Sequence, residues 1–187
     1  MRIVAGRFRG ATLATPKGQE IRPTSDRVRE SVFNILAHGV DFKFEGARVL
    51  DLFAGTGALG LEAMSRGAAF ALFVEESAEA RGLIRRNAET LGIMGATRIY
   101  RRDATKLGEI GTLAPFDLAF ADPPYGRQLG EAALASAAAG GWLVPDAVTV
   151  VEESAQAEFT VPEGFALLDQ RIYGGTGIYF LRFETSS

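Results

Sequence analysis

The most informative stretch of the chain is Val49-Leu50-Asp51-Leu52-Phe53-Ala54-Gly55-Thr56-Gly57-Ala58-Leu59-Gly60. It has an apolar strand at its start, a glycine-rich turn in its middle and the beginning of a helix at its end. The glycines permit a tight turn and allow a ligand to approach the backbone, and the start of the helix offers unpaired N–H groups. In an open α/β sheet, ligands bind at this carboxyl edge of the strands.

Segments with strand and helix character alternate outward from this stretch. Apolar runs predict strands over residues 49–53, 70–74, 98–101, 116–121, 148–151, 165–173 and 177–183, and helices between the first five over residues 58–66, 77–91, 105–112 and 129–139. This alternation predicts a parallel sheet with helices on both faces. Three residues separate the last two runs, too few for a parallel crossover, so these runs must pair antiparallel. The expected fold is α/β, a mostly parallel seven-stranded sheet with a C-terminal antiparallel hairpin.

Residues 1–37 precede this alternation and form two further predicted segments. Residues 1–22 mix strand formers with glycine and proline, a composition typical of a short β-hairpin. Residues 24–37 predict a helix in which Thr24 is the N-cap and apolar residues form one stripe. We therefore expect an N-terminal arm over residues 1–22 and a single domain over residues 23–187 that opens with this helix.

The charge of the chain is unevenly distributed. The 187 residues carry a net charge of −3, but seven of the first 30 residues are basic and three are acidic. The start is thus net +4 and the remaining 157 residues are net −7. Such asymmetry indicates a basic arm on an acidic body, aimed at a polyanion; a merely solvated arm is the alternative. The residues predicted to contact nucleic acid are Arg7, Arg9, Lys17, Arg22 and Arg27.

Residue types that are rare or absent exclude several functions. The chain has no cysteine, so it has no disulfide framework and no cysteine-bound metal. Its single histidine, His38, excludes a histidine-rich metal site and is expected to be a cap or surface residue. No apolar run approaches the ~20 residues that a membrane helix needs, and the N-terminus lacks the apolar core of a signal peptide. We expect a soluble, cytoplasmic protein that needs no metal and no membrane.

Gly55, Gly57 and Gly60 also match the dinucleotide fingerprint G-x-G-x-x-G, which keeps a nicotinamide-dependent oxidoreductase open as an alternative. Asp51 argues against that interpretation, because a carboxylate beside the turn would repel a pyrophosphate. It would instead attract an ammonium group, such as the amino end of S-adenosylmethionine. The glycine turn and Asp51 together therefore favour a cationic ligand over a dinucleotide.

Two further acids follow the next two strands of the expected sheet. Glu75 comes directly after the strand over residues 70–74 and is placed to accept hydrogen bonds from two ribose hydroxyls. Asp103 follows the third strand and can accept a hydrogen bond from an adenine amine. Each acid could also cap the helix that follows it, but three acids at the ends of three successive strands favour a bound nucleoside.

The fourth strand runs into Asp122-Pro123-Pro124-Tyr125. Two prolines remove two N–H donors, so the loop presents two acceptors, the Asp122 carboxylate and the Pro123 carbonyl. Two acceptors suit the protons of an exocyclic amine and free its lone pair to attack a sulfonium methyl, while Tyr125 stacks on the extruded base. Asp122, Pro123 and Tyr125 are therefore the predicted catalytic residues. The competing interpretation is a proline-rich strand exit in which Asp122 caps a helix.

Two more stretches carry a family resemblance, RIVAGRFRG at residues 2–10 and RPTSDRVRESVFNIL at residues 22–36. With the glycine segment and the Asp-Pro-Pro-Tyr motif at the expected places, the chain resembles the bacterial 16S ribosomal RNA (guanine-966-N2) methyltransferases along nearly its whole length. The resemblance implies a class I methyltransferase (Rossmann-like) fold with strand order 3-2-1-4-5-7-6. It also implies S-adenosylmethionine as the cofactor.

The resemblance assigns roles to particular residues. Those that would bind the cofactor are Asp51, Ala54, Gly55, Thr56, Gly57, Glu75, Asp103 and Ala104. Asp122, Pro123 and Tyr125 would hold the N2 amine of a guanine in 16S ribosomal RNA, free or in a small-subunit assembly particle, and the protein would act as a monomer. The Asp-Pro-Pro-Tyr motif is shared with adenine-N6 methyltransferases, so such an enzyme acting on DNA or RNA remains an alternative. A catalytically idle RNA-binding factor is another.

Overall fold

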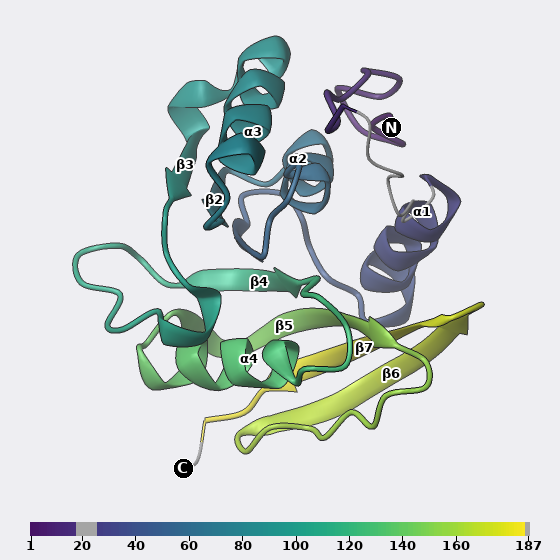
Figure 1. The fold of residues 1–187 in the computed structure, drawn as a ribbon, viewed down its shortest axis with the longest axis vertical. Coiled ribbons are helices and arrows are strands. Elements are labelled where there is room, and N and C mark those ends of the chain that lie inside the picture. Colours follow the sequence, from purple (N-terminus) through teal and green to yellow (C-terminus); the bar gives the residue numbers. More distant parts are fainter. Residues whose placement is uncertain (18–25, 186–187) are drawn as a thin grey trace.

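A seven-stranded sheet lies at the centre of the computed structural model, which describes residues 1–17 and 26–185 (Figure 1). The strand order is β3-β2-β1-β4-β5-β7-β6. The strands are β1 (Arg48–Leu52), β2 (Phe70–Val74), β3 (Thr97–Tyr100), β4 (Phe116–Ala121), β5 (Leu143–Ser154), β6 (Phe165–Tyr173) and β7 (Thr176–Phe183). All neighbours pair parallel except β7, which is antiparallel to both β5 and β6. The structure confirms the predicted sheet, its order and its C-terminal hairpin.

Four α-helices surround the sheet within the described residues. They are α1 (Asp26–Asn34), which continues into a π-helical turn over Ile35–Gly39, α2 (Ala58–Ser65), α3 (Ala78–Leu91) and α4 (Leu129–Ala139). Short 3-10 turns lie at Met94–Ala96 and Ala104–Lys106. The start of α3 is capped by Ser77, whose hydroxyl accepts a hydrogen bond from the Ala80 N–H at 3.2 Å.

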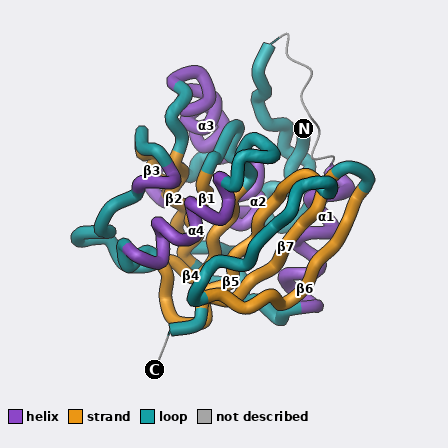
Figure 2. Tube along the Cα trace, turned by 60° about the horizontal axis from the view of Figure 1, so that its bottom comes forward, coloured by secondary structure: helices purple, strands orange, loops and turns teal. Residues whose placement is uncertain are grey.

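Alternation along the strands divides the core into two layers, one on each face of the sheet. Val49 of β1 belongs to the layer that includes Phe33 of α1 and Leu61 of α2. Its neighbour Leu50 belongs to the opposite layer, with Leu134 of α4. Figure 2 shows α4 in front of the sheet and α1 behind it. The prediction of helices on both faces is therefore confirmed.

The helix predicted over residues 105–112 is wrong. The chain makes only the 3-10 turn over Ala104–Lys106 and then an irregular loop. Gly108 and Gly111 have φ values of 71° and 69°, which a right-handed helix excludes. The indole N–H of Trp142 donates to the Gly108 carbonyl oxygen at 2.8 Å. A contact from outside the segment thus occupies a carbonyl that a helix would have paired internally.

Strand β5 is longer than predicted, extending over Leu143–Ser154 rather than residues 148–151. The extension follows from pairing on both sides, because β5 reaches β4 at Leu143 and β7 at Ser154. The other strands and the helices α2, α3 and α4 begin and end within one residue of the prediction. The predicted N-cap of the first helix, Thr24, lies outside the described residues.

The β-hairpin predicted over residues 1–22 is present in the described residues, 1–17, as a short antiparallel turn without regular strands. Its ends are paired by backbone hydrogen bonds from Ile3 to Ala11, from Gly10 to Ile3 and from Leu13 to Met1. Within the described residues their ladder is limited to one antiparallel bridge between Arg2 and Thr12. Ile3 and Leu13 are each 2% exposed and join the apolar core beside α1 and α2. This segment, called the N-terminal arm below, packs on the domain because several of its N–H groups donate to side chains of α2 rather than to a paired strand.

Candidate active site

One cavity of about 740 Å³ lies at the carboxyl ends of β1, β2 and β4. Five of the residues singled out from the sequence line it: Gly55, Glu75, Asp103, Asp122 and Pro123. Because the sheet order places β2 and β3 on one side of β1 and β4 on the other, these residues come from both sides of the glycine turn. The structure thus brings two of the three predicted cofactor acids, Glu75 and Asp103, together with the predicted amine acceptors in the lining of one cavity.

The glycine turn leaves β1 through a tight bend in which the Gly57 N–H donates to the Ala54 carbonyl oxygen at 2.8 Å. Ala54 is only 9% exposed, and its own N–H donates to Val74. Gly55 has a φ of 58° and no described atom lies within 4 Å of where a Cβ would stand, so the backbone is open to a ligand there. A Cβ at Gly57 would instead meet the Phe73 ring at 3.2 Å. Gly55 therefore serves the cavity, whereas Gly57 serves core packing.

The carboxylate of Glu75 is oriented by two backbone groups. Its Oε1 accepts a hydrogen bond from the Gly55 N–H at 2.8 Å, and its Oε2 accepts one from the Ser77 N–H at 2.9 Å. A carboxylate has about four lone-pair sites, so each oxygen can accept one more hydrogen bond. The Glu75 carboxylate is thereby held in the cavity wall, with each oxygen able to accept a hydrogen bond from one of two hydroxyl groups.

Asp103 and Ala104 lie at the 3-10 turn after β3. The Asp103 Oδ1 accepts from the Thr105 hydroxyl at 2.7 Å and from the Thr105 N–H at 2.9 Å. The Thr105 hydroxyl, followed by its N–H, holds the pKa of Asp103 below its ordinary value, so this side chain is an ionised acceptor. Ala104 is buried and lines a small cavity of about 30 Å³ with Phe53 and Arg102. Asp103 thus does cap a turn, and both of these bonds use the same oxygen.

Asp51 does not line the large cavity but lies beneath the glycine turn. It is 1% exposed, and its Oδ2 accepts a hydrogen bond from the Gly60 N–H of α2 at 2.9 Å. Burial raises the pKa of Asp51 to about 8; the nearby Glu75 charge acts in the same direction, and the Gly60 bond opposes it. The structure therefore shows a carboxyl that ties the start of α2 to β1, which is the helix-capping role given above as the alternative for these acids.

The Asp-Pro-Pro-Tyr loop leaves β4 at the edge of the cavity. Asp122 and Pro123 are in the cavity wall, while Tyr125 is half-buried and is not among the described residues that line it. The Tyr125 hydroxyl donates to Glu152 Oε1 at 2.6 Å and lies 3.0 Å from the Thr176 hydroxyl. The far end of the ring is therefore held by β5 and β7.

Sequence reasoning missed several residues at this site. Six more side chains line the cavity: Phe53, Glu76, Thr105, Pro124, Arg127 and Leu129. Phe53 has a φ of 54°, which is unusual for a bulky residue and marks a strained bend where β1 enters the turn. Glu152 and Glu153 follow the apolar run of the fifth strand, so the same signal that identified Glu75 and Asp103 could have found them.

Four of the five residues predicted to contact nucleic acid lie on the surface. Arg7, Arg9 and Lys17 of the N-terminal arm and Arg27 of α1 are exposed, and Arg22 lies outside the described residues. The Arg7 guanidinium stands over the Phe8 ring at 4.5 Å. The arm also approaches the site, because Pro16 lines a second cavity of about 190 Å³ together with Gly55 and Thr56. The bases of the arm thus lie outside the core, on a segment that borders the glycine turn.

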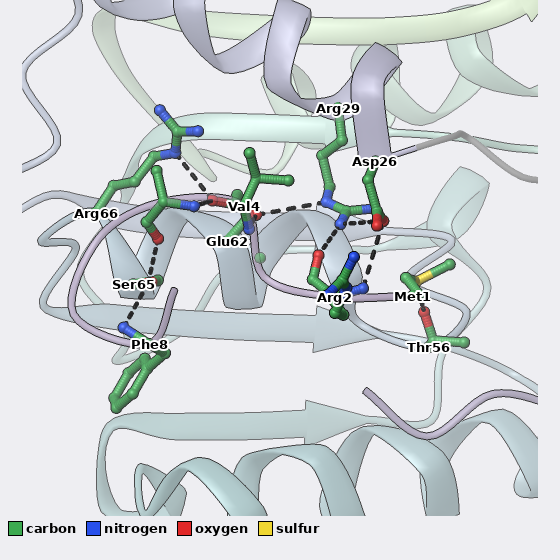
Figure 3. A network of polar contacts seen from close by, with 12 residues as sticks. Met1, Arg2, Val4, Phe8, Asp26, Arg29, Thr56, Glu62, Ser65 and Arg66 are labelled. Carbon is green, nitrogen blue, oxygen red and sulfur yellow. Dashed lines mark hydrogen bonds and ion pairs between the residues drawn. The ribbon is translucent and has the colours of Figure 1, made fainter. Parts of the chain in front are cut away.

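A buried polar network anchors the N-terminal arm, and Figure 3 shows it from close by. Glu62 of α2 is fully buried and accepts from the Val4 N–H at 2.8 Å and the Ala5 N–H at 3.1 Å. It also pairs with Arg66 at 3.0 Å and with the buried Arg29 of α1 at 3.5 Å. Arg29 additionally donates to the carbonyl oxygen of Arg2. Of the two arginines of α1, Arg29 therefore has a structural role, whereas Arg27 is exposed.

The part of the chain that the structure describes contains neither a candidate membrane-spanning helix nor a candidate metal-binding cluster. Across residues 1–17 and 26–185, no helix is both long enough and apolar enough to span a membrane. Over the same ranges, no three acidic, histidine or cysteine side chains are grouped so that they could hold a metal ion.

The sheet order, the glycine turn at its carboxyl edge and the acceptor-rich loop after β4 define the fold of a class I methyltransferase. The chain belongs to the family described as Conserved hypothetical protein 95, whose sequence pattern matches residues 1–182.

Relatives and a solved structure agree with this placement. The chain is 37% identical over 175 residues to Ribosomal RNA small subunit methyltransferase D of Escherichia coli strain K12, covering 93% of this chain and 85% of that protein. It is 33% identical over 176 residues to the Haemophilus influenzae protein of the same name, covering 93% and 89%. The solved structure of yhhF from Escherichia coli superposes with a TM-score of 0.84 at 34% identity, covering 100% of this chain and 99% of that one.

Proposed function

We propose that this protein transfers a methyl group from S-adenosylmethionine to the N2 amine of a guanine in the RNA of the small ribosomal subunit. The observation that carries the proposal is the single cavity lined by Glu75, Asp103, Asp122 and Pro123. The relatives named as small-subunit ribosomal RNA methyltransferases support the same substrate class.

The cavity fits S-adenosylmethionine in size and in chemistry. Its volume of about 740 Å³ falls within the roughly 300–1,000 Å³ of small-molecule sites. Glu75 would accept hydrogen bonds from the two ribose hydroxyls, Asp103 would accept one from the adenine amine, and the open backbone at Gly55 would lie against the ligand. When bound, the cofactor supplies a methyl group activated by its sulfonium charge. We propose that Asp51 stabilises the ammonium end electrostatically, which requires its buried carboxyl, protonated near neutral pH in the ligand-free protein, to ionise when the cation binds.

In the proposed reaction, the role of the protein is to hold the target amine. An exocyclic amine is a weak nucleophile, and hydrogen bonds from its protons to the Asp122 carboxylate and the Pro123 carbonyl favour a pyramidal nitrogen with an available lone pair. The Asp122 carboxylate can also accept the proton that the nitrogen releases as it becomes methylated. Positioning supplies most of the acceleration, since the attack is in line. Tyr125 would stack on the extruded base.

The N-terminal arm would bind the RNA backbone. A base within folded RNA must be extruded to reach Asp122, which costs a few kcal/mol. Contacts from Arg7, Arg9, Lys17 and Arg27 to phosphates would offset that cost and set the register of the RNA. We assign Arg22 to the same group from its place in the sequence.

The decisive experiment is methylation in vitro followed by mass spectrometry of the RNA nucleosides. The purified protein is incubated with labelled S-adenosylmethionine and either free 16S RNA or unmodified small-subunit particles. We expect N2-methylguanosine, and comparing the two substrates tells which one is preferred. N6-methyladenosine would establish the adenine-N6 alternative, and RNA binding without methylation would establish the idle RNA-binding factor.

Calorimetry tests the cofactor separately. We expect S-adenosylmethionine to bind and NAD not to bind, whereas the reverse would establish the oxidoreductase alternative. Glu75→Ala removes two acceptors of charge-assisted hydrogen bonds, each worth roughly 1.5–3 kcal/mol, and should weaken S-adenosylmethionine binding by about a hundredfold or more. Glu163→Ala removes an exposed glutamate and serves as the matched control. Equal affinities of the two variants would remove Glu75 from the site.

A further inference from the structure

The loop after β4 is held by two adjacent buried glutamates at the end of β5. Glu152 accepts from the Tyr125 hydroxyl at 2.6 Å, and Glu153 accepts from the Gly126 N–H at 2.9 Å. The two glutamates are 7% and 2% exposed. Consecutive residues of the loop are therefore bound by consecutive residues of one strand, which fixes both the backbone and the ring of the loop.

The C-terminal hairpin provides a third contact. Thr176 is the first residue of β7, and its hydroxyl lies 3.0 Å from the Tyr125 hydroxyl. Strand β7 is paired directly with β5, where Ser154 faces Thr176. The Tyr125 hydroxyl therefore lies between groups from two neighbouring strands, and the hairpin reaches the same loop that carries Asp122.

The Glu152 carboxylate is buried, and burying it costs free energy of hydration. A buried carboxylate loses hydration and is tolerated only when it is hydrogen-bonded. The 2.6 Å separation from the Tyr125 hydroxyl to Glu152 is in the range of a charge-assisted bond. The Tyr125 hydroxyl oxygen lies on the axis about which the ring turns, so fixing its position sets the direction of the side chain. Hydrogen bonds to a phenolic oxygen prefer the plane of the ring, so the partners Glu152 and Thr176 together favour one ring plane.

We infer that Glu152 and Thr176 are positioning residues, which fix the Tyr125 ring in the plane that receives the target base. The C-terminal hairpin is then part of the active site rather than only the end of the sheet. This inference rests on the proposed function, because it concerns the base that Tyr125 stacks on. It predicts that Tyr125→Phe is harmful, whereas ring stacking alone would make that substitution mild.

The first test measures methylation of small-subunit particles by four variants: Tyr125→Phe, Glu152→Ala, Glu152→Gln and the double variant Tyr125→Phe with Glu152→Ala. Tyr125→Phe and Glu152→Ala should each lower kcat about ten- to hundredfold, with an unchanged Kd for S-adenosylmethionine. The double variant should be no slower than the slower single variant, because both substitutions remove the same hydrogen bond. Glu152→Gln keeps an acceptor oxygen and should retain most of kcat. Wild-type kcat in Tyr125→Phe, or multiplicative losses in the double variant, would overturn the inference.

A second test does not depend on catalysis. Chemical unfolding of the same variants yields the coupling between Tyr125 and Glu152, with Glu163→Ala as the control for loss of an exposed carboxylate. We expect non-additive losses for the Tyr125 and Glu152 pair. If the wild-type protein methylates no RNA, the proposed function fails on its own account. The unfolding measurement tests the inference independently of methylation. Additive losses of stability would show that Glu152 does not hold Tyr125, and the inference would be wrong.

Discussion

The side-chain amide of Asn87 donates a hydrogen bond to the carbonyl oxygen of Thr56 at 3.0 Å. The same side chain holds the N-terminal arm, because its Oδ1 accepts from the Ala14 N–H at 2.6 Å and its Nδ2 donates to the Ala14 carbonyl oxygen at 3.2 Å. Asn87 lies on α3 and is 1% exposed. One buried side chain therefore links the arm that carries the exposed bases to the turn that borders the cavity.

Replacing Asn87 should disturb both partners. Asn87→Ala leaves one backbone N–H and two carbonyl groups without this partner, at a cost of about 1–3 kcal/mol, which lowers Tm by several degrees for a domain of this size. It should also weaken S-adenosylmethionine binding, because the turn at Thr56 loses a tether. Thermal unfolding and calorimetry measure the two effects. Thr90→Ala, an exposed change on the same helix, is the control, and equal cofactor affinities would show that the turn does not depend on Asn87.

Asp51 should make the stability of the ligand-free protein depend on pH. Its pKa is raised from 3.8 to about 8 in the folded state by burial. Between these values the unfolded chain releases a proton that the folded protein retains, so the free energy of unfolding falls as the pH rises from about 4 to about 8. Asp51→Asn keeps an acceptor for the Gly60 N–H and cannot titrate.

Chemical unfolding of both proteins across that pH range measures the effect. The wild-type protein should lose stability relative to Asp51→Asn by up to about 1.4 kcal/mol per pH unit between about pH 4 and pH 8. Other titrating groups are common to both proteins and cancel in the difference. A difference that stays constant with pH would show that Asp51 is ionised throughout, contrary to this expectation.

Asp122 should affect turnover and leave the cofactor site intact. Asp122→Ala removes one acceptor of the target amine and the group that can take its proton, so kcat should fall by about two to four orders of magnitude. The Kd for S-adenosylmethionine should change little, because Glu75 and Asp103 are untouched. Asp122→Asn keeps an acceptor oxygen and should be the less impaired variant. A fully active Asp122→Ala protein would refute the role of Asp122 in holding the amine.

The exposed bases of the N-terminal arm should determine how RNA binding depends on salt. Replacing Arg7, Arg9 and Lys17 by Gln should leave Tm nearly unchanged, since exposed charges contribute little to stability. It should weaken RNA binding and reduce the salt slope by about 0.7–0.9 log units for each phosphate that the variant no longer neutralises. The matched control replaces three exposed bases elsewhere in the chain, Lys43, Arg98 and Arg171. Equal slopes for the two variants would mean that the arm is solvated surface and that RNA binds at another face.

The amino-acid sequence by itself predicted the elements whose signals are local. The apolar run of β4 and the glycine turn after β1 each contain their own periodicity and punctuation, and both appear where they were expected. The acids that follow β2 and β3 were found in the same way, since the end of a parallel strand indicates which edge a residue occupies. Both of these acids, Glu75 and Asp103, line the same cavity.

Only the tertiary structure determined which groups, far apart in the sequence, contact one another. The bond from Tyr125 to Glu152 spans 27 positions, and the bond from Asn87 to Ala14 spans 73, so no local periodicity contains either pair. The helix expected over residues 105–112 failed for the related reason that a distant Trp142 takes the Gly108 carbonyl. Local patterns establish where strands and helices form, because their hydrogen bonds and side-chain periods are short-ranged. The partners of buried polar groups depend on folding, because desolvation forces each such group to bond with whatever the packed chain places beside it.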